Sequence, residues 1–445
     1  MKKSLLTLSL LISAITFAQS WTSQATGFNN PSRGIDEIHI VDANTIWAKA
    51  FDGVDTTVNI QEFTKTTDGG ATWTPGVIDI GNNMLEINSI CPVSATTAWL
   101  SALIPADGNG VIYKTTDGGA TWNQQNDSAF QTTGSSFING VHFFNSNNGV
   151  AYGDPVGGEY EIYLTSDGGE TWTPVSPANI PNPASGEYGY NGTPIAAGTS
   201  FWFTTNKGKL YRTTDMGVTW VKYNTPITDF GSAAINGKVI FSDNNNGLLL
   251  STTNGSATSP TYRIYRTTDG GATWSAAVTY TGYRLMTYIP GTTTIVATGA
   301  GTTSGGTGSA ISTDNGVTWT TIDTGMQRLT PAFLNASTGW CGGFNADPFT
   351  DGIFKFEPLL SNQDFITNNT SFKVLPNPAN NVVSIFSDID NSFSLKVVDL
   401  TGKTILDKEL NGIENTMDVT ALSSGIYFFK FASETKSETV KIIKN

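Results

Sequence analysis

The chain has 445 residues, of which 38% are hydrophobic and 14% charged, and its formal net charge at pH 7 is −13. This composition is typical of a folded protein, because disordered chains are richer in charge and poorer in aromatic residues. The acidic balance argues against a nucleic-acid partner, since such binding depends on clustered lysine and arginine. No apolar run beyond the first twenty residues is long enough to be a transmembrane segment.

The first eighteen residues read as an export signal. Lys2 and Lys3 precede an apolar segment, and Thr16-Phe17-Ala18 forms a small-residue cleavage site. We therefore expect a signal peptide at 1–18. The chain has only two cysteines, Cys91 and Cys341, and we expect two buried thiols rather than a disulfide.

One hairpin pattern recurs six times after this segment. The first copy is Thr66-Thr-Asp68-Gly-Gly70-Ala-Thr-Trp73. The other copies lie at 115–122, 165–172, 213–220, 267–274 and 312–319. Their tryptophans are 45 to 54 residues apart, a period that indicates propeller blades or a solenoid. The Asp-x-Gly core predicts a tight turn, so each copy is expected to be a strand, a turn and a second strand.

Two further apolar strands precede each hairpin, which makes four strands per period. After 312–319 comes a seventh pair of such strands and a third strand at 352–356, but no further hairpin. The missing fourth strand is predicted at Ser20-Trp21-Thr22, which would close a ring of seven blades. The expected fold is therefore all-β, with a seven-bladed β-propeller over 19–358.

The Ser/Thr-x-Asp-x-Gly-x-Thr-Trp pattern resembles the Asp-box, or BNR, repeat of sialidases, sortilin-type receptors and photosystem II assembly-factor-like propellers. The resemblance covers roughly 19–358 and implies the fold more strongly than any function. It implies structural boxes on the outer rim. The aspartates expected to satisfy turn amides there are Asp68, Asp117, Asp167, Asp215, Asp269 and Asp314.

Loops at the axial mouth of a propeller are where a ligand is expected. Three arginines, Arg33, Arg284 and Arg328, fall at about equivalent places in blades one, six and seven. They could converge on an anionic group, or pair with nearby acids. Sialidases use an arginine triad, but this chain has Pro31-Ser-Arg33-Gly where their Arg-Ile-Pro motif would stand, and seven blades rather than six.

Carboxylates and histidines are the other candidates for catalysis or metal binding. Carboxylates expected in mouth loops are Asp36, Glu37, Asp154, Glu159, Asp229 and Asp347, from which a glycosidase would need a facing pair. His39 and His142 occupy matched inner-strand positions of two different blades, so we expect them apart, without a carboxylate, cysteine or second histidine at ligand spacing. No complete catalytic motif, metal site or cofactor site is predicted.

Aromatic residues in the mouth loops are the remaining signal. Tyr188 and Tyr190 lie in a long irregular loop, and Tyr283 adjoins Arg284. Such side chains suit sugar or peptide recognition, although a loop tyrosine is often simply packed.

The composition changes after the propeller. A polar segment at 359–371 is predicted to be a linker, and 372–445 contains alternating strands separated by glycine turns. This pattern predicts a small antiparallel β-sandwich.

The same segment is similar to the C-terminal sorting domain of the type IX secretion system of Bacteroidetes. The resemblance rests on Pro376-Asn377-Pro378, on 398–403, on 422–427 and on Lys441-Ile-Ile-Lys444. It implies that the secretion machinery handles the chain through 372–445. It also implies passage through the periplasm to the outer cell surface or the medium.

The sequence therefore predicts a secreted or surface-displayed propeller that binds an extracellular glycan, peptide or protein. The alternative is a glycan-active enzyme, a glycoside hydrolase or polysaccharide lyase, with its site at the axial mouth. A third possibility is a scaffold for other surface proteins.

Overall fold

The structure is a computed structural model that describes residues 20–55, 57–125, 128–132, 134–192, 194–253, 260–357, 372–387, 392–433 and 437–445. The predicted signal peptide at 1–18 and the predicted linker at 359–371 lie outside these residues. The chain divides into two compact units, Met1–Leu359 and Leu360–Asn445, and each is described by itself.

The first unit consists almost entirely of four-stranded antiparallel sheets in which strands follow one another in chain order. The second to sixth repeats each form one such sheet. The second sheet has β6 (Glu86–Pro92), β7 (Ala98–Ile104), β8 (Gly108–Thr115) and β9 (Asn123–Gln124), and the third has β10 (Ile138–Phe143), β11 (Gly149–Val156), β12 (Glu159–Thr165) and β13 (Thr173–Pro174). The fourth has β14 (Ile195–Ala197), β15 (Ser200–Thr204), β16 (Lys209–Thr213) and β17 (Val221–Asn224), and the fifth has β18 (Ile235–Phe241), β19 (Gly247–Thr253), β20 (Thr261–Thr267) and β21 (Val278–Thr279). The sixth has β22 (Leu285–Tyr288), β23 (Ile295–Gly301), β24 (Gly306–Ser312) and β25 (Thr320–Thr324). Two short 3-10 turns, η1 (Pro177–Asn179) and η2 (Thr302–Ser304), lie in the connecting segments.

The remaining strands form an eight-stranded sheet that contains two groups of four. One group is β2 (Arg33–Ile40), β3 (Ile46–Asp52), β4 (Glu62–Thr66) and β5 (Thr74–Val77), and the other is β26 (Pro331–Asn335), β27 (Thr338–Asp347), β28 (Thr350–Glu357) and β1 (Ser20–Ala25). A single paired position, Gly34 opposite Phe344, joins the two groups.

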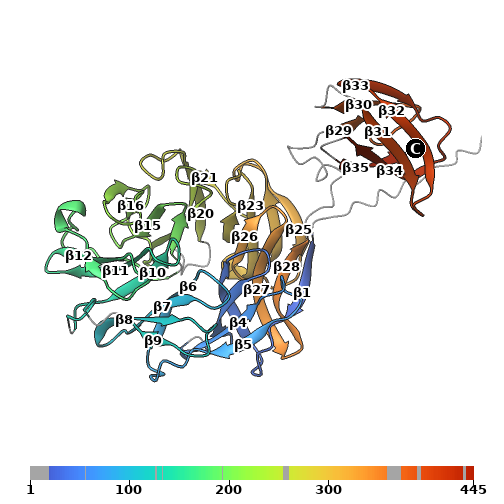
Figure 1. Ribbon diagram of the computed structural model, residues 1–445. Helices are drawn as coiled ribbons and strands as arrows, with labels where there is room; N and C mark the ends of the chain where they lie inside the picture. The colour runs from blue at the N-terminus through green and yellow to red at the C-terminus, as the bar shows by residue number, and fades with distance from the viewer. Residues whose placement is uncertain are drawn as a thin grey trace, which may run out of the picture. The chain divides into compact units, whose positions relative to one another are not determined.

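The predicted pairing of the chain start with the last repeat is confirmed. Trp21 lies opposite Phe356 and Gln24 opposite Ile353, in an antiparallel register that runs the full length of β1. Figure 1 shows β1, in blue, beside β28, in orange. The Trp21 ring packs edge-on against Phe356, and its indole nitrogen donates to Ser309 Oγ at 2.9 Å. The first strand of the described chain thus fills the fourth position of the last sheet.

The recurring hairpin turn is held by its own side chains. In the first copy Asp68 Oδ1 accepts from Thr72 N at 2.9 Å, and Asp68 Oδ2 accepts from Thr72 Oγ1 at 2.6 Å. Thr66 Oγ1 donates to Asp68 Oδ1 at 2.7 Å and accepts from Gly70 N at 2.9 Å. Gly70 has a φ of 86°, a conformation that glycine adopts without steric cost. The corresponding residues of the other five copies make the same bonds.

At five places a basic residue near the end of a third strand connects one four-stranded group to the next. Lys65 Nζ donates to Ala95 O and to Gly118 O, both at 2.9 Å, and lies 4.4 Å from the centre of the Trp47 ring. Four other residues make an equivalent contact with the next hairpin: Lys114 with Glu170, Arg212 with Asp269 O, Arg266 with Asn315 O, and Lys355 with Gly69 O. We call these five residues the cross-sheet cations.

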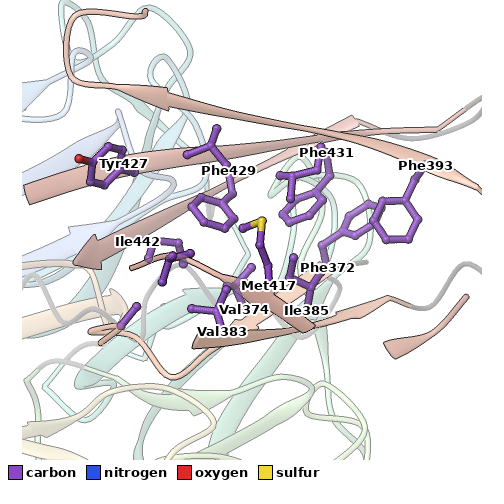
Figure 2. Close-up of a cluster of buried hydrophobic side chains, with 14 residues drawn as sticks. Phe372, Val374, Val383, Ile385, Phe393, Met417, Tyr427, Phe429, Phe431 and Ile442 are labelled. Carbon is purple, nitrogen blue, oxygen red and sulfur yellow. The ribbon is translucent and has the colours of Figure 1, made fainter. Parts of the chain in front are cut away.

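The second unit contains a three-stranded and a four-stranded sheet. The first has the order β29 (Phe372–Leu375), β30 (Val382–Ser387), β33 (Glu414–Asp418), and the second has the order β32 (Thr404–Leu410), β31 (Phe393–Asp399), β34 (Gly425–Ala432), β35 (Ser437–Lys444). Both sheets contribute to one buried cluster, in which Phe372 stacks on Phe431 with ring centres 4.5 Å apart (Figure 2). Asn377 holds the last strand, since its amide donates to Lys441 O at 2.9 Å and its carbonyl accepts from Ile443 N at 2.9 Å.

Candidate functional site

The guanidinium of Arg33 is paired with two acids of its own repeat. Its Nη1 lies 2.8 Å from Asp52 Oδ2, and its Nε lies 2.9 Å from Glu62 Oε2. Burial opposes the charge of this group, but the two carboxylates outweigh burial and raise the pKa of Arg33. Arg33 is buried, so its hydrogen-bonding capacity is used mainly inside the fold.

The other two arginines also have partners within the first unit. Arg328 is buried, donates from Nε to Asp323 Oδ2 at 2.9 Å, and lies 4.3 Å from the Phe354 ring centre. Arg284 donates to the carbonyls of Thr302 and Thr303, and its guanidinium lies 3.4 Å from the centre of the Tyr262 ring. The three guanidiniums therefore have separate sets of partners, and their role in ligand binding stays a prediction.

Two carboxylates near the start of the first sheet are paired with bases. Asp36 Oδ1 lies 3.1 Å from Lys49 Nζ, and Glu37 Oε1 lies 2.7 Å from His39 Nε2. Desolvation by the surrounding protein raises the pKa of Asp36, although the positive charge of Lys49 opposes that shift. Glu37 Oε1 also accepts from Ile90 N of the adjacent sheet at 3.4 Å.

This geometry corrects the sequence prediction that neither histidine lies near a carboxylate or a cysteine. Residues 37 and 39 lie on the same face of β2 because side chains in a strand alternate, and this puts the Glu37 carboxylate against His39. Cys91 Sγ, from the neighbouring sheet, lies 3.9 Å from His142 Nδ1. Burial, assisted by the charge of His39, lowers the pKa of His142 to about 3, so His142 is neutral at physiological pH.

Both cysteines are free and buried, as predicted. Burial raises the pKa of the Cys91 thiol to about 12, which keeps it protonated and unreactive. Among the described residues, no group of three His, Cys, Asp or Glu side chains is arranged to hold a metal ion.

The other predicted mouth carboxylates are also engaged. Asp154 Oδ1 accepts from Asn139 Nδ2 at 2.8 Å and from Gly189 N at 2.9 Å, while burial raises its pKa. Asp229 accepts from the Tyr190 hydroxyl at 2.6 Å, and Asp347 accepts from a backbone amide of its own turn. Glu159 keeps one buried carboxylate oxygen without a hydrogen-bond partner.

The predicted tyrosines occupy two different places. Tyr188 is 43% exposed and packs edge-on against Tyr190, with ring centres 5.6 Å apart. Burial, together with the hydrogen bond to Asp229, raises the pKa of Tyr190. Tyr283 instead has its hydroxyl 3.3 Å from Thr307 O, within its own sheet. The structure therefore brings Tyr188 and Tyr190 together and leaves Tyr283 elsewhere.

Tyr190 lines a cavity of about 260 Å³ between the inner strands of two adjacent sheets. One wall comes from β14 and β15 and the other from β18. The loop before β14, Phe230 and Tyr152 of β11 complete the cavity. The lining residues are Tyr152, Tyr190, Asn191, Gly192, Ile195, Trp202, Phe203, Thr204, Phe230, Gly237, Lys238 and Val239. We call this space the Lys238 cavity.

Lys238 is the residue that sequence reasoning missed at this site. It lies in the middle of β18, its side chain is exposed, and no described acid pairs with its ammonium. Desolvation of the ammonium by the surrounding protein lowers the pKa of Lys238. A single lysine in an inner strand belongs to no recognisable motif, so only the packing of two sheets shows that it lines a cavity.

The loop over the Lys238 cavity is anchored on both sides. Tyr190 N donates to Thr204 O at 3.0 Å, and Asn191 Nδ2 lies 3.4 Å from Asn88 Oδ1, a residue of a more distant sheet. The Tyr190 ring also lies against Gly231, where an added Cβ would approach Tyr190 Cε1 to 2.3 Å. The tyrosine is thus held in one position above the cavity, which is what a preformed binding site requires.

A family model described as a secretion system C-terminal sorting domain matches residues 373–445. No curated protein matches the chain in sequence. None of the helices in the described part of the chain is long and apolar enough to cross a membrane.

Solved structures resemble the chain in fold. One, described as "YCF48 bound to D1 peptide", is 15% identical, covers 77% of this chain and 97% of its own, and has a TM-score of 0.50. YCF48 from Cyanidioschyzon merolae is 16% identical, covers 76% of this chain and 99% of its own, and has a TM-score of 0.49. An ancestral GH74 enzyme is 12% identical, covers 94% of this chain and 63% of its own, and has a TM-score of 0.47.

The matched sorting domain indicates secretion to the cell surface or the extracellular space. At such low identities the similar structures establish the fold alone. The chain is therefore a secreted or surface protein that joins a unit with a β-propeller fold to a secretion system C-terminal sorting domain at 373–445.

Proposed function

We propose that the propeller has seven blades over 19–358, followed by a linker at 359–371 and a sorting sandwich at 372–445. Five separate four-stranded sheets support this count, together with the two groups of four that meet at Gly34 and Phe344. The mature chain would then begin near β1, after removal of a signal peptide at 1–18, with the recurring aspartates serving the fold.

We propose that this propeller is a binding protein for an extracellular ligand, exported by the type IX machinery through 372–445. The observation that carries this proposal is the Lys238 cavity, which combines an unpaired cation with a fixed aromatic side chain, Tyr190. Ligand sites generally combine an apolar wall with a few placed polar groups in this way.

The pairing of other charged residues supports binding over catalysis. The Arg33 and Arg328 guanidiniums are neutralised by acids of the fold, and the Asp36 and Glu37 carboxylates are paired with bases. An enzyme that uses an arginine cluster or two carboxyl groups would need these side chains to be free for its substrate.

The full exported chain, purified and incubated with arrays of glycans and peptides, tests the proposal. We expect saturable binding of one ligand class without release of new reducing ends or new peptide termini. Absence of binding to every glycan and peptide presented would contradict a binding function. Release of reducing ends would identify a glycan-active enzyme instead.

A further inference from the structure

We propose that the Lys238 cavity binds one acidic sugar unit of a glycan, with the Lys238 ammonium holding the sugar carboxylate. This inference deepens the proposed binding function and rests on it. Its elements are an unpaired cation, aromatic walls and a small number of uncharged polar groups, all contributed by described residues.

Lys238 differs from most lysines of the acidic propeller, because no partner of its ammonium lies among the described residues. Lys207 shares this property, but it lies outside the cavity. Lys49 is paired with Asp36, Lys114 with Glu170, and Lys65 with two backbone carbonyls. Lys238 has neither an acid nor a carbonyl partner among the described residues, although it lies in a concave space. A cation that faces a concave space attracts an anionic group more strongly than a cation on an open surface, because the low-dielectric protein walls focus its field there.

The walls of the cavity favour a ring with both polar and apolar surfaces. Tyr190 and Phe230 contribute aromatic side chains, and Phe203, another lining residue, is stacked on Tyr152 with ring centres 5.2 Å apart. The apolar faces of a sugar ring pack against aromatic rings. Asn191 and Thr204 add an amide and a hydroxyl that can pair with sugar hydroxyl groups.

The size of the cavity favours one sugar unit over a long ligand. A volume of about 260 Å³ is slightly below the range of roughly 300–1,000 Å³ typical of small-molecule sites. No extended groove accompanies it among the lining residues, whereas a peptide bound as an added strand needs several consecutive backbone partners. The rest of the glycan would therefore extend outside the cavity.

Calorimetric titration of the full chain with trigalacturonate tests the proposal. Matched probes are the same oligomer with its carboxyl groups reduced to alcohols, and a tetraglutamate peptide. We expect trigalacturonate to bind and both other probes to bind at least about tenfold more weakly, because a charge-assisted bond is lost in one and the ring in the other.

Two variants assign the site. Lys238→Met keeps an unbranched side chain of similar length without the charge, and it is expected to weaken trigalacturonate binding at least about tenfold. Lys207→Met removes an exposed lysine outside the cavity and is expected to leave the affinity unchanged. Thermal unfolding is measured for both variants. An unfolding temperature equal to that of the parent chain would show that the fold is intact.

Each other outcome identifies what has failed. Equal binding by Lys238→Met would refute this site but leave the binding function in place. Tetraglutamate binding that depends on Lys238, without trigalacturonate binding, would refute the sugar and indicate an acidic peptide. If trigalacturonate does not bind although another glycan in the arrays does, this inference alone fails, and if nothing binds, the proposed function fails with it.

Discussion

Six aspartates with the same local hydrogen bonds influence how the propeller responds to acid. Hydrogen bonds from the threonine side chain and backbone four residues later lower the pKa of Asp117 to about 2, from an ordinary value of 3.8. The same contacts act on the other five aspartates. Because the folded-state pKa lies below the unfolded one, each ionised carboxylate stabilises the fold above about pH 4, and the contribution is lost as the pH falls toward 2.

The Asp117→Asn variant tests this contribution. An asparagine amide nitrogen cannot accept the bond from Thr121 Oγ1, so we expect a lower unfolding temperature at pH 7. Below pH 4 the parent chain should lose stability more steeply than the variant, and the two curves should converge.

Circular dichroism melts between pH 7 and pH 2 would measure both curves. Other titrating groups, including His142, act equally on both chains and cancel in the difference. Curves that stay parallel down to pH 2 would contradict the assigned role of the carboxylate.

Sequence reasoning at the scale of single residues succeeded where contacts are local. The turn bonds of Asp68 involve residues at most four positions away, and such bonds follow from the motif itself. The partners of Arg33 and the exposure of Lys238 depend on packing between strands that the sequence does not place. The pairing of Glu37 with His39 was overlooked although strand alternation could have indicated it.

At the scale of elements, the cross-sheet cations connect one hairpin turn to the next. Each of these cations lies near the end of a third strand and reaches the turn of the following repeat. Four of the five, all but Arg266, also lie over a tryptophan of the second strand. Lys355 reaches Gly69 O at 3.1 Å, which links the last repeat to the first. The sequence shows a lysine or arginine at these positions, but it does not show that the side chain reaches the neighbouring four-stranded group.

Replacing Lys65 by methionine should weaken the contact between the first two repeats. The ammonium donates two hydrogen bonds to carbonyl oxygens, and bonds of this kind contribute about 1.5–3 kcal/mol each, less where water replaces them. We expect the free energy of unfolding to fall by about 1–3 kcal/mol. Guanidinium titration followed by tryptophan fluorescence would measure the change.

Lys207→Met serves as the control for this variant, because Lys207 is exposed and joins no two repeats. Its unfolding free energy should equal that of the parent chain. An unchanged midpoint for Lys65→Met would show that the cross-sheet bonds contribute nothing measurable to stability.

At the scale of the whole molecule, β1 closes the propeller by completing its last sheet. The strand was predictable because a repeat count left one fourth strand missing, and the register of Trp21 with Phe356 confirms that prediction. The loops between repeats were not predictable in the same way. Their lengths vary, and the loop carrying Tyr190 covers a cavity that no repeat position encodes.

A variant lacking Ser20–Ala25 should lose this closure. Its β28 would expose an unpaired edge, and such edges promote association between chains. We expect a lower unfolding temperature and oligomers or aggregates in size-exclusion chromatography. A monomer with the unfolding temperature of the parent chain would show that β1 is dispensable.

The function proposed for the propeller depends on ligand binding in the Lys238 cavity. Hydrogen–deuterium exchange of the full chain, with and without saturating trigalacturonate, addresses it most directly. We expect slower exchange at 190–192 and 237–239, two of the segments that line the Lys238 cavity, and unchanged exchange in the hairpin turns. Protection confined to other loops, or to no segment of the propeller, would contradict it.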